Sequence, residues 1–292
     1  MNLTYFHDEP VAIFETPRAD AIGLIVSDIT NPFFAEVIPA IEKRLEDDGF
    51  VTLVGNTSEN RTKEVCLVKK MREFPTDGIL ICPALGSGSS AGAPSLAGRL
   101  PIVAFARRAP GLDYAGVDNA KGAQLAVEHL YQRGHQRIAF IGGNPKASTG
   151  QERIEGYQRA LTRLGLQFDP LLVFPSDPNR PGGRDSVQRL LQMESRPTAA
   201  LCFNDAVALG VIEAIQRSGL KIGADFGVVG FNDVSGAADS SPALTTIDTA
   251  PRQLGETAAE LLLRRIAKPD SLVQTAILKP RLIVRESCGT IS

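Results

Sequence analysis

Polar, charged and aromatic side chains follow several apolar runs of this chain, at the points where those runs end. Short apolar runs of this kind are typical of buried strands. Amides, carboxylates, guanidinium groups and aromatic faces together bind polyhydroxylated ligands, because they hydrogen-bond to hydroxyls and cover apolar ring faces. The candidates are Asn31, Phe33 and Phe34 after residues 22–26, Arg107 after 102–105, Thr149 and Arg153 after 138–141, Asn204 after 199–203, and Asn232 after 227–231.

Some of these positions also have a local explanation. Asn204 or Asp205 could cap the helix that follows, and Arg153 could pair with Glu152 or Glu155 on the surface. For each residue taken singly the sequence leaves both alternatives open. Their shared location favours a ligand site, because the carboxyl ends of parallel strands form one edge of a sheet, and α/β proteins bind ligands there.

Two glycine-rich motifs overlap in residues 86–92, one of the dinucleotide-binding type (GxGxxG/A) and one of the nucleophile type (GxSxG). Both require a strand directly before and a long helix directly after. Here Pro83 and Pro94 flank the motifs, so we interpret this segment as a solvated loop. The three histidines show no metal-ligand spacing, and no acid–base pair stands out. The sequence therefore predicts no cofactor, no metal site and no enzymatic activity.

Strand and helix patterns alternate along the whole chain, which predicts an α/β fold of two similar Rossmann-like lobes with parallel sheets. Glycines at 134, 165 and 219 end predicted helices in positions that suit a left-handed cap. The further predicted strands are 51–54, 78–82, 171–174 and 274–279, and the predicted helices are 34–45, 62–74, 121–134, 151–165, 183–193, 205–219 and 251–267.

The composition is that of an ordinary soluble protein of 292 residues, with 43% hydrophobic residues and a net charge of −2. A surplus of basic charge, which would favour nucleic-acid binding by this chain, is not present. No secretory signal or membrane-spanning run is visible, and the four cysteines form no CxxC motif. These features favour a cytoplasmic location.

Several segments together resemble the lactose-repressor-like (LacI/GalR) family of bacterial transcription regulators. They are IGLIVSDITNPFFAEV from residue 22, GVDNAKGAQLAVEHLYQRGHQRIAFIGG from 116, FNDAVALG from 203, VVGFNDV from 228 with SPALTTID, and PRLIVRES from 280. The resemblance implies a periplasmic-binding-protein-like fold of type I, with two lobes joined by three crossovers. We expect one lobe from residues 20–120 and 246–276, and the other from 121–245 and 277–288.

The resemblance implies a small effector, often a sugar or nucleoside, bound in the cleft between the lobes. It assigns Asn31, Phe33, Phe34 and Arg107 to the first wall, Arg153, Asn204 and Asn232 to the second, and Thr149 and Thr249 as further candidates. Many sugar-binding relatives carry aspartate where this chain has Ala106 and Asn232. The loss of two hydroxyl acceptors favours a neutral or anionic effector, such as a sugar phosphate or a sugar acid, over a plain aldose.

Members of this family also carry a helix-turn-helix headpiece before the first strand. Residues 1–19 have net negative charge, and we expect them to be a flexible segment outside the family fold. We expect this polypeptide to be a homodimer that reaches operator DNA only through a headpiece it does not itself contain, since DNA binding needs several basic contacts. The alternatives are a free-standing solute-binding protein of a transport system and a nucleotide-using enzyme.

Overall fold

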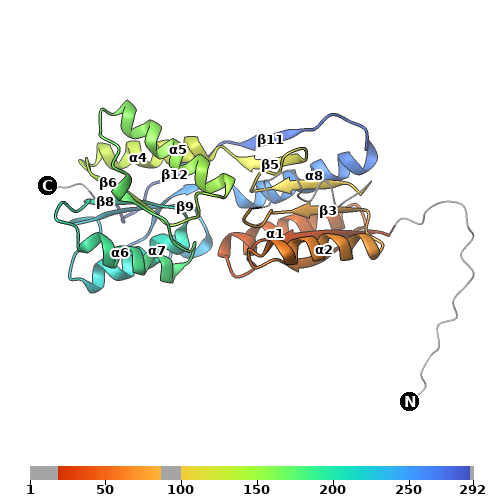
Figure 1. Cartoon of the computed structure of the whole chain (residues 1–292), viewed down its shortest axis with the longest axis horizontal. Coiled ribbons are helices and arrows are strands. Elements are labelled where there is room, and N and C mark those ends of the chain that lie inside the picture. Colours follow the sequence, from red (N-terminus) through yellow and green to blue (C-terminus); the bar gives the residue numbers. More distant parts are fainter. Residues whose placement is uncertain (1–18, 87–99, 290–292) are drawn as a thin grey trace, which may run out of the picture.

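The computed structural model describes residues 19–86 and 100–289, which form two α/β lobes arranged along the long axis of the molecule (Figure 1). The glycine-rich motifs beyond Gly86 and residues 1–18 lie outside the described part, so the loop and flexible-segment predictions made for them stay predictions. None of the described helices is long and apolar enough to cross a membrane.

The first lobe is built on a six-stranded sheet of order β11-β5-β4-β3-β1-β2, in which all neighbouring strands are parallel. Helices α1 and α8 cover one face and α2 packs on the other. Its elements are β1 (Ala21–Val26), α1 (Pro32–Glu46), β2 (Val51–Asn56), α2 (Arg61–Glu73), β3 (Gly78–Ile81), β4 (Ile102–Phe105), β5 (Asp113–Val117), α8 (Pro251–Ala267) and β11 (Thr275–Leu278).

The second lobe has a sheet of order β12-β10-β9-β8-β6-β7, parallel except for the pair β10–β12. Helices α4 and α5 cover one face, and α6 and α7 the other. Its elements are α4 (Asn119–Gln132), β6 (Ile138–Ile141), α5 (Ser148–Arg163), η1 (Pro170–Leu172), β7 (Val173–Phe174), α6 (Arg180–Leu191), β8 (Ala199–Cys202), α7 (Asp205–Arg217), β9 (Gly227–Asn232), η2 (Ser235–Ala237), β10 (Thr245–Asp248) and β12 (Arg281–Ile283).

The chain passes between the lobes three times, after β5, after β10 and after β11. The predicted fold class is therefore confirmed. Two of the predicted lobe boundaries need to move, because 245/246 falls inside β10 of the second sheet and 276/277 falls inside β11 of the first. On strand pairing we propose boundaries after Val117, Asp248 and Leu278.

Helix α1 illustrates how local sequence positions residues at the sheet edge. The Asn31 side chain accepts a hydrogen bond from the Phe33 N–H, and Pro32 occupies the first helical position. The apolar face of the helix, from Phe34 through Val37, packs on the sheet of the first lobe. Glycines follow the C-terminal ends of α4, α5 and α7. Gly134, Gly165 and Gly219 have φ of 95°, 71° and 86°, the left-handed conformation predicted for these cap positions.

Three strands, β5, β10 and β12, were not predicted from the sequence. Polar residues interrupt them, and these are satisfied by partners far along the chain: Asp113 in β5 binds Arg265 at 2.7 Å, and Thr246 in β10 donates to Asp205 at 2.5 Å. The run at 171–174, predicted as a strand, is a 3₁₀ turn followed by only two strand residues. Apolar periodicity therefore missed β5 and β10, which carry buried polar side chains, and also the three-residue, partly exposed β12.

Candidate functional site

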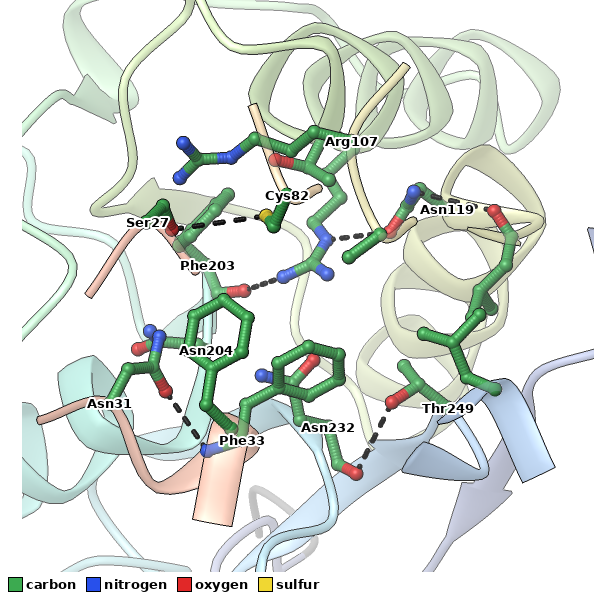
Figure 2. Close-up of a pocket in the computed structure, with 16 residues that line it drawn as sticks. Ser27, Asn31, Phe33, Cys82, Arg107, Asn119, Phe203, Asn204, Asn232 and Thr249 are labelled. Atoms are coloured by element: carbon green, nitrogen blue, oxygen red, sulfur yellow. Dashed lines mark hydrogen bonds between the residues drawn. The ribbon is translucent and has the colours of Figure 1, made fainter. Parts of the chain in front are cut away.

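A pocket lies between the lobes, at the carboxyl ends of β1, β4, β6, β8 and β9. Side chains from both lobes surround it (Figure 2). All nine residues named as ligand-binding candidates line this pocket: Asn31, Phe33, Phe34, Arg107, Thr149, Arg153, Asn204, Asn232 and Thr249. The structure therefore brings the strand-end residues together, and their contact with a ligand stays a prediction.

The first-lobe wall is aromatic. The ring centroids of Phe33 and Phe34 lie 5.3 Å apart at 74°, and Phe34 in turn packs edge-on against Phe105 at 6.3 Å. Edge-to-face packing of this kind fixes ring orientation. Because Phe34 is held by Phe105 inside the core, Phe33 at the mouth of α1 is the ring best placed to cover an apolar ligand face.

Arg107 is already paired within its own lobe. Its Nη1 and Nη2 donate to the two carboxylate oxygens of Glu59 at 2.7 and 2.8 Å, and Nη1 also donates to the Pro83 carbonyl at 3.1 Å. Such a bidentate pair neutralises the guanidinium charge and fixes its plane. Glu59 was not predicted from the sequence. It lies 48 residues before Arg107, and only the folded arrangement brings the two side chains together.

Arg153 is buried in the second-lobe wall, with 6% of its surface exposed. Its Nε donates to Asn119 Oδ1 at 2.9 Å, its Nη1 donates to the Phe203 carbonyl, and its guanidinium stacks 3.7 Å from the Phe231 ring centroid. The surface pairing considered from the sequence is absent among the described residues, since Glu152 pairs with Arg108 and Glu155 with Arg159. Burial lowers the pKa of Arg153 to about 9.

Asn204 performs the structural role that the sequence had left open. Its Oδ1 caps α7 by accepting from the Val207 N–H at 2.9 Å, and its Nδ2 donates to the Pro178 carbonyl at 2.9 Å. The neighbouring Asp205 is buried and accepts from Thr246 and from the Val234 N–H. Burial raises the pKa of Asp205 to about 6. Asn204 therefore presents to the pocket an amide that is already hydrogen-bonded on both sides.

The backbone around the pocket is strained at three strand ends. Ala106 has φ of 58°, Asn232 of 117° and Ala250 of 49°, values that L-residues rarely adopt. Strained backbone of this kind is found near binding sites when the surrounding structure enforces it. The Thr249 hydroxyl lies 3.4 Å from the Asn232 carbonyl, which ties the start of α8 to the end of β9 across the crossover.

Several pocket residues were missed from the sequence, in particular Ser27, Cys82, Asn119 and Phe203. Asn119 follows β5, so it was missed together with that strand. Ser27 directly follows the predicted strand 22–26, and Phe203 is the last residue of the predicted strand 199–203, so both lie one position or less from the strand ends used in the prediction. Among the described residues, no group of three histidine, cysteine or acidic side chains could hold a metal ion.

Comparison with known proteins places this geometry in a family. Residues 127–288 match the periplasmic binding protein-like domain family. The HTH-type transcriptional repressor PurR of Aliivibrio salmonicida is 33% identical over 91% of this chain and 80% of its own length, and the ribose operon repressor of Haemophilus influenzae is 33% identical with the same shares. The LacI family transcriptional regulator from Enterococcus faecium, solved with bound ribose, aligns with a TM-score of 0.83 and 28% identity, over 93% of this chain and 100% of that one. The chain therefore belongs to the LacI/GalR family of bacterial transcription regulators.

Proposed function

We propose that this chain is the effector-sensing region of a transcription regulator and binds a sugar or sugar-derived ligand in the interlobe pocket. The observation that carries this proposal is that both lobes line one pocket with amides and guanidinium groups, and that the first lobe adds the aromatic ring of Phe33, which packs against Phe34. Such a set recognises hydroxyls and an apolar ring face at once. The ribose bound to the similar Enterococcus faecium regulator supports the same ligand class.

A ligand in this pocket would favour one arrangement of the lobes, because it would touch both. Direct contacts already join the lobes beside the pocket: Arg108 Nε donates to Glu152 at 2.8 Å, the Arg108 N–H donates to Ser148 Oγ at 3.0 Å, and the Ser235 N–H donates to Glu36 at 3.0 Å. A ligand with higher affinity for the closed arrangement would shift the population towards it. We propose that this shift changes the affinity of the full regulator for operator DNA.

We further propose that the regulator acts as a cytoplasmic homodimer. Strand β2 is the edge of the first sheet and exposes three large apolar side chains, Val51, Leu53 and Val54. An exposed apolar sheet edge is a surface that proteins usually cover with a partner. A second copy of the same chain would cover this edge on both subunits.

The ligand proposal can be tested by thermal unfolding with a panel of pentoses, hexoses, sugar acids, sugar phosphates and purine bases. A ligand present at about 100 times its Kd should stabilise the folded state by about 2.7 kcal/mol, because it binds only that state. Stabilisation by nicotinamide nucleotides alone, with no response to any sugar or sugar derivative, would contradict the proposal.

The substitution Asn232→Gly provides the matched site variant, because glycine suits the φ of 117° while the amide is removed. It should weaken ligand binding by about 10-fold or more, the effect of one lost hydrogen bond to the ligand. Asp20→Gly is the control, since Asp20 has φ of 50° but lies before β1, at the end away from the pocket. Equal ligand affinity in both variants would argue against this pocket.

A further inference from the structure

A short segment of the second lobe packs into the core of the first. Val234, which comes soon after β9, is only 5% exposed and belongs to the apolar cluster that Phe33 and Phe34 form with the first sheet. Among the described residues, every other buried member of this cluster comes from the first lobe. The core of the first lobe is therefore completed by a side chain of the second.

Residues 233–235, which we call the interlobe strap, also make polar contacts on both sides of the pocket. The Ser235 N–H donates to Glu36 Oε1 of α1 at 3.0 Å, so the strap is hydrogen-bonded to the first lobe as well as packed against it. At its base, the Asn232 carbonyl accepts from the Thr249 hydroxyl at 3.4 Å. Thr249 lies on the crossover from β10 to α8, so the strap lies beside one of the three passages between the lobes.

The second lobe holds the strap in a strained conformation. Asn232 and Asp233 have φ of 117° and 56°, values that L-residues rarely adopt. Two side chains enforce it: the buried Asp205 accepts from the Val234 N–H at 2.9 Å, and Arg285 pairs with the Asp233 carboxylate at 2.7 Å. Strain of this kind persists only where the surrounding structure enforces it. The second lobe therefore presents Val234 to the first lobe in one fixed position.

We infer that docking of the interlobe strap on the first lobe fixes the arrangement of the two lobes and thereby sets the affinity of the pocket between them. Val234 is removed from water only while it is docked, and burial of apolar surface is favourable. Asn232, two residues before Val234, lines the pocket, so a molecule that binds there contacts the base of the strap. The docking itself needs no ligand, whereas its effect on affinity rests on the proposed function.

Spin-label distances between the lobes test the docking without any ligand. One label occupies Cys66, which is exposed on α2, and Gln188→Cys places the second on the exposed face of α6, while the other cysteines are buried. Dilution with unlabelled protein keeps the measured distances within one chain. Val234→Ala should broaden the distance distribution, because the smaller side chain shifts the equilibrium towards undocked lobes by about 10-fold.

Matched variants separate docking from general stability. Val103→Ala removes the same atoms from the same cluster but within β4 of the first lobe, so it should lower the stability to urea and leave the distances unchanged. Glu36→Ala removes the acceptor of the Ser235 N–H and should shift the equilibrium by about 3-fold, which also covers the case in which Val234→Ala does not fold. Glu42→Ala, on the exposed side of the same helix, is its control.

Calorimetry with ribose, glucose and ribose 5-phosphate measures the effect on affinity. Whichever of them binds should bind several-fold more weakly to Val234→Ala and Glu36→Ala and equally well to the two controls, because only the docked fraction has a complete pocket. Unchanged distances in Val234→Ala and Glu36→Ala would overturn the inference, and so would equal broadening in Val103→Ala.

Two further outcomes separate the inference from the proposed function. Broadened distances with unchanged affinity would overturn the inference, because it ties the affinity of the pocket to the docked arrangement, and would leave the proposed function in place. If the distances broadened as expected but no sugar or sugar derivative bound, the proposed function would fail, and the strap would remain as the contact that fixes the lobes.

Discussion

Individual residues around the pocket adopt backbone conformations that their side chains disfavour. Ala106 has φ of 58°, a left-handed conformation in which a Cβ approaches the following carbonyl. The position is held by two hydrogen bonds, from the Ala106 N–H to the Ala115 carbonyl at 2.9 Å and from the Tyr114 hydroxyl to the Ala106 carbonyl at 3.0 Å. These bonds involve only backbone atoms of Ala106, so a residue without a Cβ can keep them.

We therefore expect Ala106→Gly to raise the free energy of unfolding by about 1 kcal/mol, since the strain of the Cβ is removed. Urea unfolding of both proteins measures the change. Ala214→Gly is the control of opposite sign, because Ala214 lies inside α7, where glycine should cost about 1 kcal/mol. A loss of stability in Ala106→Gly as large as in the control would show that the left-handed backbone at Ala106 is not strained.

At the scale of elements, apolar periodicity in the sequence predicts most of the helices and strands that the structure contains. Helix α8 spans the predicted residues, and β1, β3, β4 and β6 match apolar runs. Strand β5 could not be found this way because it opens with Asp113, whose carboxylate becomes acceptable only when Arg265 of α8 pairs with it from 152 residues away. Asn119, which lies two residues after the end of β5, was absent from the site prediction for the same reason.

The contact between α4 and the C-terminal segment makes stability depend on pH. His129 of α4 is buried, its Nε2 lies 3.0 Å from Cys288 Sγ, and burial, with a smaller effect of the Arg133 charge, lowers its pKa. Burial also raises the pKa of the Cys288 thiol, which stays neutral. Below about pH 6.5 the unfolded chain takes up a proton at His129 that the folded protein does not, so stability falls as pH falls.

His129→Gln should reduce this acid sensitivity, because glutamine does not titrate. Urea midpoints measured at about pH 7.5, 6.5 and 5.5 should fall for the unsubstituted protein and fall less for the variant. His135, whose pKa is also lowered by burial, remains in both proteins and accounts for part of the remaining slope. Parallel slopes in the two proteins would exclude a contribution from His129.

At the scale of the whole molecule, the two lobes present different surfaces to a partner. In the described part of the chain, β11 and β2 form the two ends of the first sheet, and β2 exposes Val51, Leu53 and Val54 at 61%, 44% and 43%. The other edge strand, β11, exposes one large apolar side chain, Ile277 at 41%, and Leu272, at 89%, belongs to a connection rather than to a sheet edge. The β2 edge is therefore the surface of the described part that best fits a second copy of the chain.

Leu53→Glu should convert a dimer into a monomer, because it would bury unpaired charges at a symmetric interface. Sedimentation velocity over a range of protein concentrations measures the change in mass. Leu272→Ser removes an even more exposed side chain and should leave the association unchanged. If Leu53→Glu associated as strongly as the unsubstituted protein, an interface on this edge would be excluded.

The sequence alone determined the fold class and the neighbourhood of the site, because strand–helix alternation and strand-end residues are properties of short segments. The tertiary structure decided which of those residues are available to a ligand. Glu59 occupies Arg107, the cap of α7 occupies Asn204, and Arg153 with Thr149 is left buried without an ionic partner among the described residues. Those outcomes depend on burial and pairing between segments far apart in the chain, and only the folded arrangement brings such segments into contact.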